Sequence, residues 1–184
     1  MSKQDDAALA FVTVAGEPPE DEGLLPLTRE LSRVEAVNQA FFDAYRERDI
    51  EGMEAVWLGS PHARCVHPSW ELVVGWTDIR ESWAELFRSL QHADLQVEDL
   101  HIEVAGRVAW SNQLVYATLH TEDGEVISAA SIATNLFEIS EGEWRLVLHH
   151  ASAFVEDDLD EDEDPLDLDP ERPPQGGSGM SGPN

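Results

Sequence analysis

The chain has 184 residues, a length typical of one domain with additional segments. Its 38 acidic residues outnumber the 11 basic ones, and the formal net charge is −27. Because affinity for nucleic acid comes mainly from basic side chains that neutralise phosphates, this charge argues against binding to nucleic acid or to an anionic membrane. The one cysteine, Cys65, cannot form an internal disulfide, so we expect a reducing, cytoplasmic location.

The two ends of the chain lack the pattern of a packed domain. We expect residues 1–27 to be a flexible leader, because Asp5 and Asp6 stand where a signal peptide would carry positive charge. Residues 156–184 are strongly acidic and then rich in proline and glycine, and they offer too little apolar surface to offset the entropy of ordering. We therefore expect a disordered tail there. No run approaches the roughly 20 apolar residues of a membrane span, which leaves residues 28–155 as the folded domain.

Three helices are predicted in the first half of this domain. Thr28 is a candidate N-cap for a first helix with apolar residues at helical spacing, and Asp49 can cap a second, shorter helix. A short strand is predicted over 63–67. A third helix follows a Thr77 cap, with apolar residues three and four apart between 79 and 90.

From residue 95 onward the apolar period changes from 3.6 to two, which indicates strands. Turn residues rich in glycine and acidic side chains separate the apolar runs. The four predicted strands cover residues 95–105, 108–120, 126–139 and 144–154. Helices followed by an antiparallel meander predict an α+β fold, in which the helices cover one face of a sheet.

Five short motifs occur in this order of elements: Cys65-Val66-His67-Pro68, Gly75-Trp76, Ser82-Trp83, Thr134-Asn135-Leu136-Phe137 and His149-His150-Ala151-Ser152. Motifs and order together resemble the SnoaL-like domains of the nuclear transport factor 2 superfamily, whose enzyme relatives include ketosteroid isomerase and scytalone dehydratase. The resemblance covers about residues 31–155. It implies a cone-shaped domain whose sheet curls around the helices and leaves a deep, mostly apolar pocket. The superfamily contains isomerases, dehydratases, cyclases and non-catalytic association modules, so the fold alone does not select a function.

The resemblance gives two residues candidate catalytic roles. By position, His67 is similar to the carboxylate base of ketosteroid isomerase, and a neutral imidazole suits a general base. Asn135 is similar to the carboxyl group that donates a hydrogen bond to the developing oxyanion, and an amide can also donate. Phe41 stands where the family has an oxyanion tyrosine, which argues against steroid isomerisation. Two alternatives remain open: both residues are structural polar groups, or they bind a ligand without chemistry.

The alternation of side chains along the strands predicts which residues face the pocket. Placing Arg107 and Arg145 in solvent puts Trp110 and His150 on the inner face, and placing Glu138 in solvent puts Asn135 there. Two loop tryptophans could stack on a flat ligand at the pocket mouth, or they could fix the loop to the core. The predicted pocket residues are Phe41, Trp57, Trp70, Trp76, Trp110 and His150.

We expect no metal and no cofactor, because adjacent strand residues such as His149 and His150 point to opposite faces and cannot readily bind one ion. Two functions remain open. The domain is either a cofactor-independent isomerase, lyase or hydrolase that acts on a small apolar or aromatic molecule with His67 as general base, or a non-catalytic association or ligand-carrier module that uses the acidic tail for interactions. A homodimer is expected through the outer sheet face, where the alternation places Ala109, Leu136 and Val147.

Overall fold

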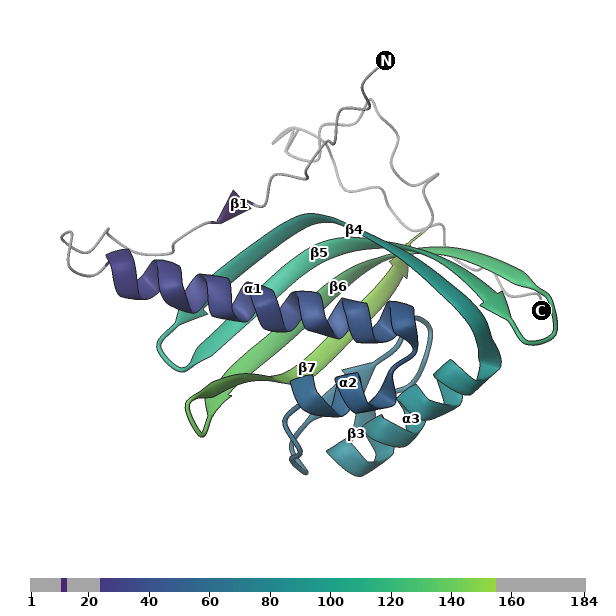
Figure 1. Ribbon diagram of the computed structural model, residues 1–184, viewed down its shortest axis with the longest axis horizontal. Coiled ribbons are helices and arrows are strands. Elements are labelled where there is room, and N and C mark those ends of the chain that lie inside the picture. The colour runs from purple at the N-terminus through teal and green to yellow at the C-terminus, as the bar shows by residue number, and fades with distance from the viewer. Residues whose placement is uncertain (1–10, 13–23, 155–184) are drawn as a thin grey trace, which may run out of the picture. The chain divides into compact units, whose positions relative to one another are not determined.

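The computed structural model describes residues 11–12 and 24–154 (Figure 1). Three helices and a curled sheet form one compact unit. The helices are α1 (Leu24–Glu47), α2 (Ile50–Val56) and α3 (Trp76–Ser89). The strands are β1 (Phe11–Val12), β2 (Arg64–Val66), β3 (Val73–Val74), β4 (Leu90–Ala105), β5 (Val108–Thr121), β6 (Val126–Ser140) and β7 (Glu143–Phe154). The predicted α+β fold is confirmed.

The sheet has seven strands in the order β1-β4-β5-β6-β7-β2-β3. The long strands β4 to β7 form the predicted antiparallel meander, and β2 joins it parallel to β7. β1 and β3 are additions that the sequence analysis missed, and each has only two residues. Apart from β1 and the first residues of α1, the predicted leader and tail, 1–27 and 156–184, lie outside the described residues.

Two helix starts differ from the prediction. α1 begins at Leu24 rather than after Thr28, and it includes Pro26 in its first turn. Proline is tolerated there because the first N–H groups of a helix have no partner within the helix. α3 begins directly after Gly75, which adopts φ 86°, so Thr77 is not its cap. The Asp49 cap of α2 is confirmed, since its side chain accepts a hydrogen bond from the backbone N–H of Glu51. Among the described residues, no helix is both long and apolar enough to cross a membrane.

A β-bulge in β7 reverses the predicted alternation of that strand. The pairing between β6 and β7 shifts between Leu136 and Phe137, so that Val147 is an extra residue on β7. An extra residue inverts the inside-outside pattern for every position after it. Val147 and His149 are therefore buried and His150 is exposed. The prediction that His150 faces inward was wrong for this reason.

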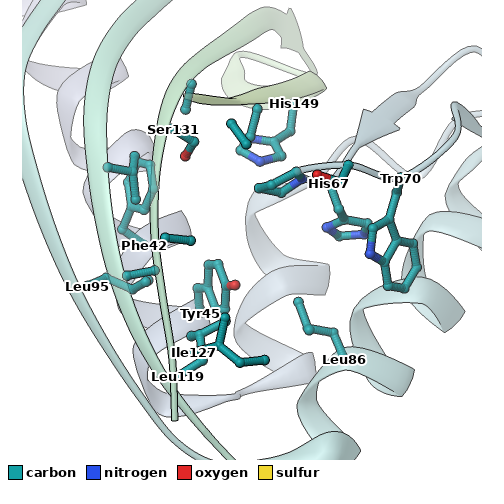
Figure 2. A pocket seen from close by; sticks show the side chains of 18 of the residues that line it. Phe42, Tyr45, His67, Trp70, Leu86, Leu95, Leu119, Ile127, Ser131 and His149 are labelled. Carbon is teal, nitrogen blue, oxygen red and sulfur yellow. The ribbon is translucent and has the colours of Figure 1, made fainter. Parts of the chain in front are cut away.

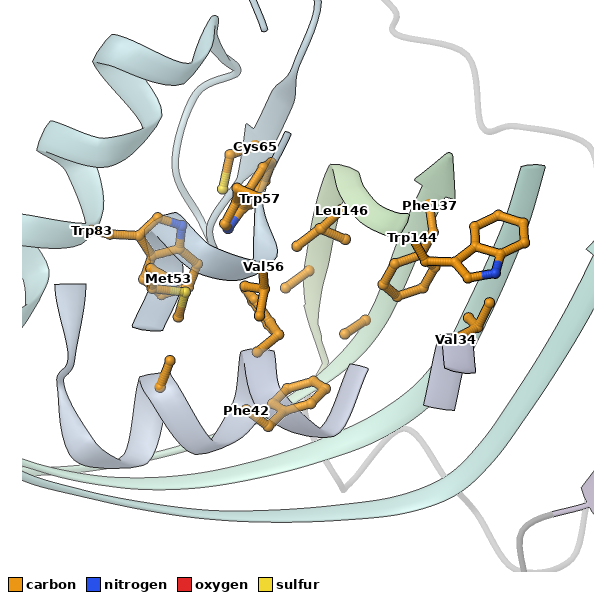
Figure 3. Close-up of a cluster of buried hydrophobic side chains, with 14 of the residues drawn as sticks. Val34, Phe42, Met53, Val56, Trp57, Cys65, Trp83, Phe137, Trp144 and Leu146 are labelled. Carbon is orange, nitrogen blue, oxygen red and sulfur yellow. The ribbon is translucent and has the colours of Figure 1, made fainter. Parts of the chain in front are cut away.

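The alternation predicted for β5 was also inverted. Arg107 belongs to the turn after Gly106, which adopts φ 64°, so the direction of its side chain says nothing about the strand. Ala109 and Ser111 are fully buried, whereas Trp110 lies on the outer face opposite Leu136 of β6. The prediction for β6 was right, since Asn135 is fully buried. Large side chains from α1, α2, β6 and β7 fill the core, as Figure 3 shows for Val34, Met53, Trp57, Phe137, Trp144 and Leu146.

Candidate functional site

A cavity of about 330 Å³ lies between α1, α3, the loop after β2 and the inner face of the sheet (Figure 2). Large apolar side chains form much of its wall, and small residues of β5, β6 and β7 complete it. Among the described residues, no lysine, arginine, aspartate or glutamate lines it. The large apolar residues are Phe42, Trp70, Trp83, Leu86, Leu95, Val115, Leu119 and Ile127. The polar residues are Tyr45, His67, Ser69, Ser131 and His149.

His67 lies at the end of β2, where Pro68 follows it, and its side chain is 2% exposed. Its Nε2 atom lies 2.9 Å from the hydroxyl oxygen of Ser82 on α3. The Ser82 hydroxyl donates its proton to the carbonyl of Ile79 at 2.8 Å. The Ser82 oxygen therefore accepts a hydrogen bond from the ring, so the proton of the neutral imidazole is on Nε2. Nδ1 then carries no proton and presents a lone pair.

His149 is the second imidazole of the cavity, and Asn135 lies behind it. The Nδ1 atom of His149 is 2.7 Å from Oδ1 of Asn135, and Nδ2 of Asn135 donates to Oδ1 of Asn38 at 2.8 Å. Ser111 donates to the same oxygen of Asn38 at 3.1 Å. Asn135 is fully buried and is not part of the cavity wall, so its amide is committed to His149 and Asn38.

Burial keeps the polar groups of the cavity neutral. It lowers the pKa of His67 to about 4 and, together with the neighbouring charges of His67 and His150, lowers the pKa of His149 to about 3. Burial raises the pKa of Tyr45 to about 12, so its phenol stays protonated. The buried thiol of Cys65 also has a raised pKa and lies 3.8 Å from Nε2 of His67, which makes it a poor nucleophile.

Aromatic rings fix the walls of the cavity around His67. Trp83 contacts it edge to face with a centroid distance of 4.4 Å, and Trp70 does so from the loop at 4.7 Å. Trp70 is 43% exposed, which places it at the mouth of the cavity. Tyr45 packs on Trp83 at 5.1 Å, and Figure 2 shows its hydroxyl pointing into the cavity.

The structure brings only part of the predicted site together. His67 and Trp70 line the cavity, whereas Phe41 lies behind His149 with a ring distance of 4.9 Å. Trp57 is buried in the core and stacks on Trp76, which borders a separate surface hollow. Trp110 and His150 lie on the outer face. The wall of the cavity therefore does not include the five predicted residues Phe41, Trp57, Trp76, Trp110 and His150. For Trp110 and His150 the predicted direction was inverted, as described above. The other three lie in the core behind the cavity or beside the separate hollow.

Most of the cavity wall was not predicted, including Phe42, Tyr45 and His149, and neither was Ser82, the hydrogen-bond partner of His67. Tyr45 and Phe42 are three residues apart on α1, and this spacing could have indicated that both rings share a face. Ser82 stands in the Ser82-Trp83 motif, but only the packing of α3 on β2 brings it to His67. Within the described residues, no three histidine, cysteine, aspartate or glutamate side chains gather to hold a metal ion.

Comparison with known proteins identifies a family and a related plant protein. The model of the SnoaL-like domain family matches residues 34–156. The F-box protein SKIP8 of Arabidopsis thaliana is 32% identical over 123 residues, which are 67% of this chain and 50% of that protein. The chain thus matches about half the length of that relative.

Solved structures agree with this match. A domain from Thiobacillus denitrificans, provisionally described as a calcium/calmodulin-dependent protein kinase type II association domain, has a TM-score of 0.56 and 30% identity over 66% of this chain and 94% of its own. An NTF2-like superfamily protein from Salmonella enterica (TM-score 0.64, 17% identity, 72% and 94% covered) and a ketosteroid isomerase-like protein from Erwinia carotovora (0.60, 19%, 68% and 97%) share the fold. The chain therefore belongs to the SnoaL-like domain family, and it shares its fold with NTF2-like proteins.

Proposed function

We propose that this domain binds a small, largely apolar molecule in the cavity between α1 and the sheet. The observation that carries the proposal is the wall itself, which is apolar except for two serines, Tyr45, His67 and His149. Small-molecule sites are usually concave and apolar, with a few polar groups that orient the ligand. A cavity of about 330 Å³ falls within the usual range for such sites.

Within this site we assign His67 the role of general base in a cofactor-independent isomerisation, elimination or hydrolysis. Its bare Nδ1 takes a proton from an acidic C–H group or from a water, and the imidazolium returns that proton to another substrate atom or to the leaving group. Because burial lowers the pKa of His67 to about 4, the imidazolium releases its proton readily. A transient substrate anion would accept a hydrogen bond from the protonated Tyr45.

Asn135 takes a different role in this proposal from the one expected. Its oxygen faces His149 and its nitrogen donates to Asn38, so neither end is directed at a ligand. We therefore propose Asn135 as a support of His149 rather than as the oxyanion donor. Phe41 likewise supports His149 from behind.

The experiment is a comparison of two variants at neighbouring positions of β6. Ala129 lines the cavity and Ala130 does not. Compounds extracted from the purified full-length protein would be identified by mass spectrometry, and their binding to Ala129→Phe and Ala130→Phe would be measured. We expect Ala129→Phe to lose the bound compound and Ala130→Phe to keep it. Equal retention by both variants would contradict the cavity as the site.

The second candidate function is a dimeric association module, located in the cytoplasm and using the acidic tail for interactions. The similarity to a provisional kinase association domain at 30% identity favours it. So does the outer sheet face, where Ile132 is 51% exposed and Val108 39% exposed. Of the three residues expected on this face, Leu136 lies there, but Ala109 and Val147 are buried inside.

Sedimentation equilibrium tests the dimer separately from the cavity. We expect the full-length protein to sediment as a dimer at tens of micromolar and Ile132→Glu to sediment as a monomer, because a buried unpaired carboxylate opposes association. The matched control is Glu35→Gln, which removes a charge at an exposed position of α1, on the helical layer and not on the outer sheet face. A wild-type protein that remains monomeric would contradict the association function.

A further inference from the structure

Two histidines line one cavity, and each has one ring nitrogen bonded to the protein and one left for a ligand. His67 uses Nε2 and His149 uses Nδ1. No hydrogen bond to the other ring nitrogen of either histidine is found in the described part of the chain, and both residues line the cavity. Figure 2 shows His149 at the top of the cavity and His67 to its right, beside Trp70.

A chain of amides sets the proton position on His149. Oδ1 of Asn38 accepts from both Ser111 and Nδ2 of Asn135. With its nitrogen committed to Asn38, Asn135 presents its oxygen to His149 at 2.7 Å. A carbonyl oxygen accepts and does not donate, so Nδ1 of His149 carries the proton and Nε2 is bare.

The proton position on His67 follows from a different residue. The single hydroxyl proton of Ser82 goes to the carbonyl of Ile79, so Ser82 accepts the Nε2 proton of His67. Nδ1 of His67 is then bare. The two rings are held in opposite tautomers, and both offer a lone pair rather than a proton to the cavity.

We propose that the cavity selects a neutral, flat molecule that donates two hydrogen bonds, such as a dihydroxylated aromatic compound, and that it rejects carboxylates and phosphates. The aromatic side chains of Phe42, Tyr45, Trp70 and Trp83 suit a flat ring. Two lone pairs repel an anion, and the described part of the chain places no cationic side chain in the wall to compensate. Asn38 and Asn135 act as positioning residues for His149. This inference rests on the proposed small-molecule site.

The binding test measures the Kd of a series of probes for the full-length protein by tryptophan fluorescence or calorimetry. The probes are naphthalene, naphthol, a panel of naphthalene diols and naphthoate. We expect each hydroxyl that finds a histidine to tighten Kd about 3- to 10-fold. Naphthoate should bind at least about 10-fold more weakly than naphthalene. His149→Phe should remove the gain from one hydroxyl, and His150→Phe, the exposed neighbour, should leave the series unchanged.

Nitrogen NMR of the protein with labelled histidine rings tests the tautomers directly. We expect His67 protonated on Nε2 and His149 protonated on Nδ1, and we expect Asn135→Leu to lose the fixed tautomer of His149 while His67 keeps its own. A proton on Nε2 of His149 would mean that the amide chain runs in the reverse sense, and it would overturn the inference. Binding that ignores the hydroxyl groups would overturn it while leaving the proposed site standing, whereas failure of every probe would contradict both.

Discussion

The space between α1 and the sheet is filled at one end and empty at the other, although the same strands line both ends. At the filled end, β6 and β7 contribute Phe137, Trp144 and Leu146 (Figure 3). At the other end the same strands contribute small residues to the wall of the cavity, namely Ala129, Ala133, Ala151 and Ala153. Side-chain size along two strands therefore decides which part is core and which part is a site.

The polar groups of the two ends differ in the same way. Nε1 of Trp144 donates to Glu30 at 2.8 Å, and that carboxylate also pairs with Arg33 at the edge of the filled end. At the cavity end, His67 and His149 each keep one ring nitrogen without a partner among the described residues. At the filled end Trp144 finds its partner in the protein, although Nε1 of Trp57 is buried without one in the described part of the chain. The cavity end leaves hydrogen-bonding capacity where a ligand could use it.

Removing a ring from the filled end should have the largest effect on stability. Phe137 is fully buried among other large side chains, so we expect Phe137→Ala to lower the free energy of unfolding by about 3–5 kcal/mol. Urea denaturation measures this. Leu136→Ala, on the opposite face of the same strand, serves as the control and should cost clearly less. Equal losses would mean that the filled end is not the stability centre.

His67→Gln should affect activity far more than folding. Glutamine can keep the hydrogen bond to Ser82 but cannot act as a titrating base, so we expect any turnover to fall by about 100-fold or more. Thermal unfolding of the same variant should stay close to that of the wild type. A variant that fails to fold would assign His67 a structural role, and unchanged turnover would place the base elsewhere.

Acid should destabilise the cavity end through its buried histidines. The pKa of His67 is about 4 in the folded protein, against an ordinary value of 6.5. The unfolded chain therefore binds more protons between these two values, so the stability present above pH 6.5 is lost as pH falls toward 4. Between pH 7 and pH 4.5 we expect wild type to lose about 2 kcal/mol more than His67→Gln. This double difference cancels the titration of the carboxylates. Parallel pH profiles for the two proteins would contradict the buried neutral imidazole.

Adding a phenylalanine ring at each end should give the smallest difference in the free energy of unfolding, but the most direct comparison of the space at the two ends. Ala109 is fully buried at the filled end, and Ala129 borders the cavity. We expect Ala109→Phe to cost about 1–3 kcal/mol by overpacking and Ala129→Phe to change stability by less than about 1 kcal/mol, because the added ring has space. Denaturation curves compare the two variants. A larger loss for Ala129→Phe would show that the cavity end cannot accept volume.

The sequence alone determined the element types and their order, because helix and strand periods, caps and turn residues are local properties. The changes of period near residue 95 and the Asp49 cap were sufficient to predict α2 and the meander of β4 to β7. The motif around His67 placed that residue at the end of a short strand, where it lines the cavity. Very short strands such as β3 carry too few residues for any period to appear.

Only the tertiary structure decided which histidine faces the cavity and what holds it. One extra residue, Val147, turns His149 inward and His150 outward, and a bulge depends on pairing with β6 rather than on the sequence of β7 alone. Asn135, which bonds to His149, is 14 residues away along the chain. Asn38, which bonds to Asn135, is a further 97 residues away. Such contacts leave no local pattern, because they form only when α1 packs across the sheet.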